Sequence, residues 1–225
     1  RRLRESALVE AIAGIRAYPS ATVTTIGDLA RVTSGMTPLR SNKAFYEGGR
    51  IPWVTSGDLS SGVVDAAIQF VTERAIAETS LKLVRAGAIL VAMYGEGKTR
   101  GAAALLDIDA TTNQACAAIQ LHDGDLRQWV KLVLDAHYAA MRRMAIGGVQ
   151  PNLNLSLVRS IEVPLPPESA RVAALDRVRE IEEQCAILGK SLDVTLRRVV
   201  TLRHAVLGAA FSGQWCGDDS DSRVA

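Results

Sequence analysis

The sequence predicts an α+β protein: a globular domain of mixed helices and strands with a twisted, antiparallel-rich sheet, followed by a long C-terminal coiled-coil helix. Two changes of texture along the 225 residues indicate this architecture. Between Thr22 and Pro167, short apolar runs rich in Val, Ile and Thr alternate with Gly, Pro, Asn and Asp, as in short strands joined by turns. From residue 168 onward there is no proline, and apolar residues recur in heptads.

The chain opens on the last turns of a helix, at residues 1–17, which Gly14 ends as a C-cap. The globular domain then covers 18–167. A helical period runs over 125–145, and a short helix is expected at 75–82. The predicted strands of this domain are 22–26, 51–55, 68–71, 88–93, 102–107, 115–120 and 161–163.

The final helix is predicted over 168–213 and carries five apolar heptads. At 1.5 Å per residue it would extend for roughly 60 Å, too far for one small domain to cover. We therefore expect it to pair with another helix, although Thr195 interrupts the seam and Ala209 weakens it. A lone surface helix with an apolar stripe is the alternative. The tail 214–225 is acidic and is expected to be disordered. The expected helix-pairing residues are Val178, Ile181, Cys185, Leu188, Leu192, Val199, Leu202 and Val206.

Composition excludes several classes of protein. The three cysteines are far apart and match neither a zinc site nor a disulfide framework, so we expect a reducing, cytoplasmic setting. No apolar run reaches the roughly 18 residues that span a bilayer, and no membrane partner is expected. Because the first residue is not Met, we expect the chain to be a processed product or a segment of a longer protein.

No pattern points to catalysis. AMYGEGKT at 92–99 ends like a phosphate-binding loop, but Ala92 stands where that loop requires its first glycine. The following residues, RGAAALLDID, indicate a strand, whereas a phosphate loop needs a helix N-terminus. We favour a hairpin tip and keep a phosphate-loop nucleotide-binding protein as the weaker alternative. We expect no enzyme activity, no catalytic residue, no cofactor and no metal.

Polar side chains gather instead in turn-forming segments. Arg, Lys, Asn, Gln, Ser, Thr and Tyr are the residues that contact phosphates and read base edges. For each segment alone, turn chemistry is the simpler explanation; together they indicate a recognition surface. Residues 19–166 hold fourteen basic and thirteen acidic residues, so any DNA contact would rely on local patches. The segments are SGMTPLRSNKAFYEGG (34–49), TSGD (55–58), YGEGKTRG (94–101), TTNQA (111–115) and GGVQPNLN (147–154).

Several blocks, in order, resemble the DNA-specificity (S) subunit of type I restriction-modification systems, and the resemblance covers nearly the whole chain. They match a target recognition domain followed by its long helix. The blocks are IGDLARVTSGMTP (26–38), IPWVTSGDL (51–59), ILVAMYGEGKTRGAAAL (89–105), TTNQACAAI (111–119), GGVQPNLNLSLVRSIEVPLPP (147–167) and LRHAVLGAAFSG (202–213).

This resemblance implies a non-catalytic subunit with two tandem halves, whose long helices pack antiparallel and set the spacing of a bipartite site. Its partners would be double-stranded DNA, modification subunits that carry the methyl donor, a motor-nuclease subunit, and a sister helix of the same subunit or a second copy. Only one recognition domain is present, so another half must read the second half-site. The glutamine common after the paired prolines in this family is not obvious in PPESARVAAL.

The start of the chain also fits a two-period protein. LRESALVEAIAG (3–14) shares five positions with LRHAVLGAAFSG (202–213), so residues 1–14 should end the preceding helix and lie antiparallel near 168–185. A coiled-coil scaffold with a protein-binding head is the other alternative. The expected DNA contacts are Thr37, Arg40, Lys43, Tyr46, Ser56, Lys98, Thr99, Arg100, Asn113, Gln150 and Asn152, with Arg142 and Arg143 as phosphate ligands.

Overall fold

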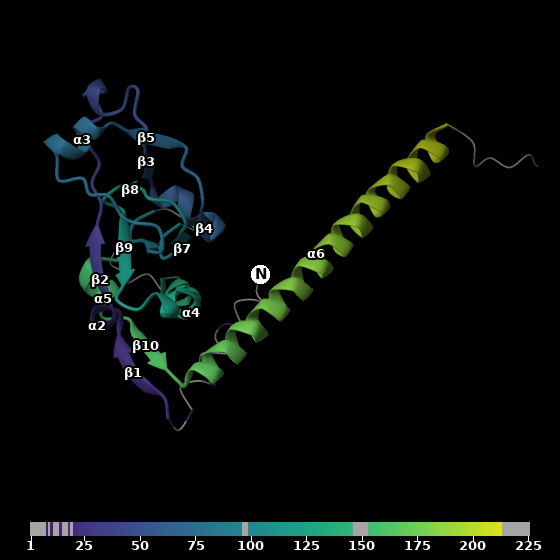
Figure 1. The fold of residues 1–225 in the computed structure, drawn as a ribbon. Helices are drawn as coiled ribbons and strands as arrows, with labels where there is room; N and C mark the ends of the chain where they lie inside the picture. Colours follow the sequence, from purple (N-terminus) through teal and green to yellow (C-terminus); the bar gives the residue numbers. More distant parts are fainter. Residues whose placement is uncertain are drawn as a thin grey trace, which may run out of the picture. The chain divides into compact units, whose positions relative to one another are not determined.

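The computed structural model describes residues 20–95, 99–145 and 153–212, together with the single residues 8, 10, 14 and 18. It divides into two compact units, Arg1–Val178 and Arg179–Ala225, which are described separately. Five of the seven strand pairings in the described part are antiparallel. The predicted mixed α/β fold with an antiparallel-rich sheet and a long C-terminal helix is confirmed (Figure 1).

Three sheets form the first unit. The central sheet has the order β2-β9-β6-β7-β4, in which only the short β4 is parallel to its neighbour. A second sheet, β5-β3-β8, lies at one end of the unit, and the pair β1-β10 lies at the opposite end (Figure 1). The strands are β1 (Thr22–Thr25), β2 (Ala30–Ser34), β3 (Ile51–Val54), β4 (Val63–Val64), β5 (Gln69–Val71), β6 (Ile89–Ala92), β7 (Ala103–Leu106), β8 (Thr111–Thr112), β9 (Cys116–Leu121) and β10 (Glu162–Leu165).

Local capping decides where several helices begin. Thr25 accepts a hydrogen bond from the Asp28 backbone, and the Asp28 carboxylate accepts one from the Thr25 N–H, which forms a capping box. This box ends β1 at Thr25, so the strand predicted at 22–26 is one residue shorter. The helices are α2 (Ile26–Leu29), α3 (Glu73–Glu78), α4 (Arg127–Ala145), α5 (Leu155–Arg159) and α6 (Glu168–Phe211), with 3-10 turns at Lys43–Phe45, Ser56–Ser61 and Gly124–Leu126.

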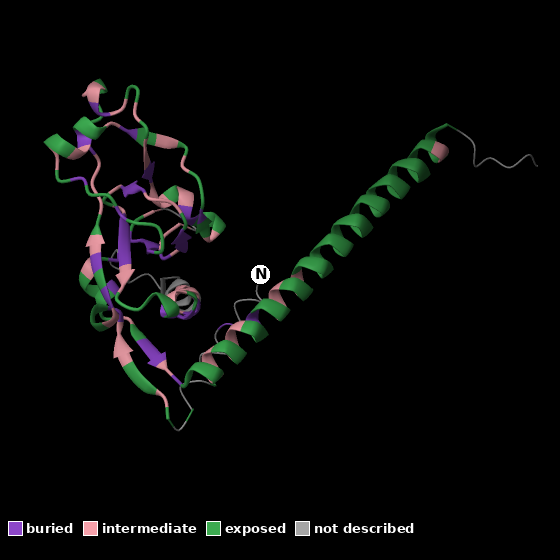
Figure 2. Cartoon of the chain, in the orientation of Figure 1, coloured by how far each residue is buried: buried purple, intermediate pink, exposed green. Residues whose placement is uncertain are grey.

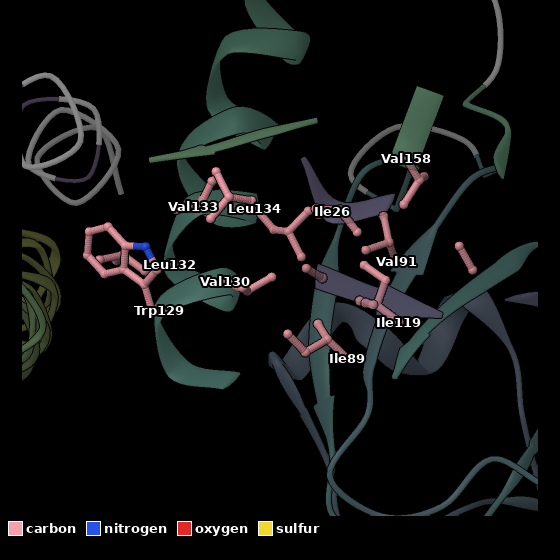
Figure 3. Packing of buried hydrophobic residues seen from close by; sticks show 14 of the residues in the cluster. Ile26, Ile89, Val91, Ile119, Trp129, Val130, Leu132, Val133, Leu134 and Val158 are labelled. Atoms are coloured by element: carbon pink, nitrogen blue, oxygen red, sulfur yellow. The ribbon is translucent and has the colours of Figure 1, made fainter. Parts of the chain in front are cut away.

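The central sheet is buried on both faces. Alternate side chains of β6, Ile89 and Val91, belong to the same buried cluster as Val130 of α4. Figure 3 shows Val130 on the side of α4 that faces these strands. Leu90 and Ala92 point to the other face and pack in a second cluster. Burial on both faces explains why β6 is a continuous apolar run in the sequence.

The helix α6 changes environment along its length. Val178 is 6% exposed and shares a buried cluster with Leu8, and Leu175 packs against the same cluster. Ile181 and Cys185 are half-buried, while the seam residues from Leu188 onward are exposed (Figure 2). Leu8 belongs to the segment expected near the start of this helix. The direction of that segment and the tail 214–225 lie outside the described residues.

Candidate nucleic-acid interface

Strand register brings four of the five polar segments to one end of the central sheet. β9 lies between β2 and β6, and both of these strands end beside the start of β9. Residues 35–42, 93–95, 99–102 and 113–115 therefore leave the sheet at the same end. β3 ends parallel to β8, which adds residues 55–58. These four loops, which we call the loop face, come from separate parts of the chain.

Of the fifth segment, 147–154, the structure describes only Leu153 and Asn154. Its last residue, Asn154, accepts a hydrogen bond from the Leu157 N–H and caps α5. α5 packs on α2, which precedes β2 and so lies at the opposite end of the sheet from the loop face. The side chains of five predicted contacts are not described by the structure: Lys98, Arg142, Arg143, Gln150 and Asn152.

Residues 35–42 are held by hydrogen bonds along their length. The Gly35 and Met36 N–H groups donate to the carbonyls of Cys116 (3.4 Å) and Thr112 (2.9 Å). Further along, the Thr37 hydroxyl donates to the Gln114 side chain. The carbonyls are also used: Trp53 Nε1 donates to Met36 O at 3.2 Å, and the Tyr46 hydroxyl donates to Pro38 O at 2.6 Å. This loop is fixed before any ligand arrives.

Gly35 makes the close approach of this loop possible. A Cβ added at Gly35 would overlap the carbonyl and hydroxyl of Thr112, which is fully buried. Only glycine lets the backbone pass Thr112 at this point. The glycine in the SGMT sequence therefore has a steric role.

Arg40 lies at the tip of the loop and stacks on two aromatic rings. Its guanidinium carbon is 4.6 Å from the Trp53 ring centroid and 5.2 Å from that of Tyr46. The two rings meet edge to face, with centroids 6.0 Å apart. Both terminal nitrogens of Arg40 donate to Gln69 Oε1, each at 3.3 Å. Such cation–π contacts contribute about 0.5–2 kcal/mol and hold the group in place while it stays exposed.

Burial raises the pKa of the Tyr46 phenol, and the Arg40 charge opposes that shift. The phenol therefore stays protonated at neutral pH and can donate to Pro38. Thus Tyr46, a predicted DNA contact, supports the loop through its hydroxyl. Thr37 likewise bonds to Gln114, and Asn113 Oδ1 accepts from the Ala115 N–H at 3.2 Å.

The other predicted contacts lie in the loop face or directly beside it. Lys43 forms an exposed ion pair with Glu47 at 3.5 Å. Ser56 opens a 3-10 turn, and Thr99 is half-buried. The Nε of Arg100 is buried without a hydrogen-bond partner. Sequence reasoning missed Trp53 and Gln69 as parts of the site. Trp53 stood in the IPWVTSGDL block, whereas Gln69 lay in a predicted strand with no distinguishing signal.

The structure argues against the phosphate-loop alternative. β6 pairs antiparallel with β7, so the segment between them is a hairpin and leads into a strand. A phosphate loop requires a helix at that place. Lys98 itself lies outside the described residues.

The described part of the chain holds no cluster suited to a metal, and its buried cysteine is protonated. No group of three or more His, Cys, Asp or Glu residues is arranged to hold a metal ion there. Burial raises the pKa of the Cys116 thiol to about 12. Over the same residues, no helix is long and apolar enough to cross a membrane.

Comparison with known proteins gives a consistent result. The chain is 26% identical over 183 residues to the EcoR124I/EcoR124II specificity subunit of Escherichia coli, covering 80% of this chain and 44% of that protein. The fold resembles a chain from a structure of type I R-M system assembly (18% identity, TM-score 0.68, 94% of this chain and 54% of that chain). It also resembles the HsdS subunit of Thermoanaerobacter tengcongensis (18% identity, TM-score 0.61, 95% and 54%).

The chain spans about half the length of these relatives. The family model for the type I restriction modification DNA specificity domain matches residues 21–193, which is most of the chain. The domain from β1 to the middle of α6 is therefore covered by a single family. This chain belongs to the family of type I restriction modification DNA specificity domains.

Proposed function

We propose that this chain reads one half of a bipartite DNA site as the non-catalytic recognition part of a type I restriction-modification complex. The observation that carries this proposal is the loop face: three polar loops leave the central sheet at one end, a fourth follows β3 beside them, and one of the four carries a stacked arginine. Family membership supports the same reading.

The loop face would enter the major groove, where each base pair presents a distinct pattern of donors, acceptors and methyl groups. Contacts to phosphates would fix the register of the domain on the duplex. A loop that is already ordered loses little conformational entropy on binding, and this favours affinity. The bonds along residues 35–42 are suited to that role.

The exposed seam of α6 supports one of the proposed partners, a sister helix. Large apolar side chains from Leu188 to Val206 are exposed in the single chain, which favours pairing with a sister helix. Two such helices would set the spacing between two recognition domains. The second domain would come from the rest of a longer chain or from another copy. Modification subunits would dock on this cytoplasmic assembly, and a motor-nuclease subunit would join for cleavage.

The methylome of cells that express the complete system tests this proposal. We expect methyladenine within a single bipartite motif, and a change in one half of that motif when residues 35–42 are exchanged for those of a relative. Methylation without a bipartite motif would contradict the proposal. If the motif stays the same after the exchange, residues 35–42 do not determine the sequence that is read.

A further inference from the structure

Gln69 and Arg40 form a pair at the tip of the loop face. Gln69 lies opposite Trp53 in the β3–β5 register, and Arg40 stacks on Trp53, so both side chains project from the same place. Arginine has no hydrogen-bond acceptor. Gln69 must therefore turn its carbonyl oxygen toward Arg40, and its NH2 group points away from the guanidinium.

The contact leaves one edge of the guanidinium open. Both terminal nitrogens of Arg40 donate to Gln69 Oε1, so the edge of the guanidinium between these two nitrogens is occupied. The edge formed by Nε–H and one terminal N–H has no hydrogen-bond partner among the described residues. Together with the Gln69 NH2, the pair presents donors and no acceptor.

The neighbours of the pair favour a base edge over a phosphate. Leu39 precedes Arg40 and is 67% exposed, and Ile68 precedes Gln69 and is 85% exposed. Apolar side chains gain contacts at base edges and thymine methyl groups, and they gain none at a charged phosphate.

We infer that the Arg40–Gln69 pair selects a guanine in the half-site. Guanine presents two acceptors, N7 and O6, on its major-groove edge, which match a surface of donors only. Adenine and cytosine each place an amino donor there and would oppose the pair, and thymine offers one acceptor, O4, where guanine offers two. This inference rests on the proposed function, because it names the base that the loop face reads. Gln69 acts as a positioning residue, since it fixes which edge of Arg40 is available.

The first test compares methylomes of cells whose complete system carries the wild-type chain, Arg40→Ala or Gln69→Leu. We expect the wild-type half-site to contain a G·C pair that relaxes to several bases in Arg40→Ala and in Gln69→Leu, while the other positions stay unchanged. Arg74→Ala is the matched control, because Arg74 is exposed on α3 and forms its ion pair with Glu78 of the same helix. The control should leave the motif unaltered.

The second test changes the DNA, so its first measurement is made on the wild-type complex and is free of any effect on folding. The complete complex is titrated with a cognate duplex in which 7-deazaguanine, which lacks the N7 acceptor, replaces each guanine in turn. We expect one position to lose affinity on the order of 10-fold with the wild-type complex. The Arg40→Ala complex should not distinguish the two duplexes at that position.

The outcomes separate the two proposals. A wild-type system without a bipartite motif contradicts the proposed function itself. A bipartite motif with no G·C pair in this half-site, or an Arg40→Ala system that methylates the same motif less efficiently at every position, overturns the guanine assignment alone.

Discussion

At the scale of single residues, the loop face depends on contacts that remove freedom from exposed side chains. Arg40 is exposed, yet two rings and Gln69 limit where its guanidinium can lie. The rings are themselves fixed, because Trp53 is buried and each donates to a carbonyl of the loop that it supports. The loop at residues 35–42 and the strand beneath it therefore form one rigid element.

Gly35→Ala should destabilise this element. The φ angle of Gly35 lies outside the left-handed region, so the cost comes from the overlap of the new Cβ with the buried Thr112 carbonyl. Overpacking of this kind costs about 1–3 kcal/mol, which urea unfolding followed by circular dichroism would measure. Gly57→Ala is the control, since its Cβ would come no closer than 3.7 Å to a neighbour. Equal stability of the two variants would contradict this reading.

The two described cysteines should differ sharply in reactivity. Burial, and to a smaller extent the Asp58 charge, raise the pKa of Cys116 to about 12, whereas Cys185 is half-exposed. Only the thiolate reacts, so iodoacetamide at pH 8 should modify Cys185 and leave Cys116 intact. Mass spectrometry of the Cys216→Ser chain would measure this, with urea-unfolded protein as the positive control. Modification of native Cys116 at the rate of Cys185 would refute it.

The same pKa has a consequence for stability. The folded chain holds the Cys116 proton more tightly than the unfolded chain, whose thiol has its ordinary value of 9.0. The stabilisation is complete below pH 9 and is lost as the pH rises through about 12. A Cys116→Ala chain should therefore lose less stability than wild type between pH 9 and 11 in thermal unfolding.

At the scale of elements, the seam of α6 should act in association and not in folding. Leu192 is 62% exposed, so Leu192→Glu should leave the unfolding transition of the domain unchanged while it prevents helix pairing. Val194 is 51% exposed and only two positions away, on another face of the helix. Sedimentation should show loss of association for Leu192→Glu and not for Val194→Glu. Equal effects of both substitutions would show that this seam is not the pairing surface.

How far the sequence predicted the elements depended on how each is stabilised. β6 was predicted because a run of four buried apolar residues is visible locally. β8 has two residues and exists only through its parallel pairing with β3, nearly sixty residues earlier, so no local pattern identifies it. β2 was missed because it carries only two buried apolar side chains among polar ones. The helix predicted at 75–82 spans Glu73–Glu78, because Thr72 caps its start and Thr79 is already extended.

In the candidate site, too, local features were predictable from the sequence and long-range contacts were not. The polar loops were visible as turn-forming segments, and their convergence required the strand register. The Arg40–Gln69 contact joins residues 29 positions apart, which a sequence pattern cannot connect. The roles of Tyr46, Thr37 and Asn113 as supports depended on hydrogen bonds to backbone and side-chain partners that only the fold brings near.

At the scale of the whole molecule, the near-neutral recognition domain limits what the chain can do alone. Non-specific DNA affinity comes mainly from neutralised phosphates, and each one adds about 0.9 to the slope of log K against log salt. With fourteen basic and thirteen acidic residues in 19–166, we expect weak binding and a shallow salt slope for the isolated chain. Under the proposed function, a complex with modification subunits should bind more tightly and with a steeper slope. Fluorescence anisotropy with one labelled duplex over a series of salt concentrations would measure both.

The salt slope also separates the two kinds of contact at Arg40. A base contact releases no counterion, so Arg40→Ala in the complete complex should reduce discrimination between cognate and scrambled duplexes, by about 1–3 kcal/mol, without changing the slope. A phosphate contact would instead weaken binding to both duplexes alike and lower the slope by about one unit. The stacked position of Arg40 between apolar neighbours favours the first result. Loss of about one unit of slope with unchanged discrimination would assign Arg40 to the DNA backbone.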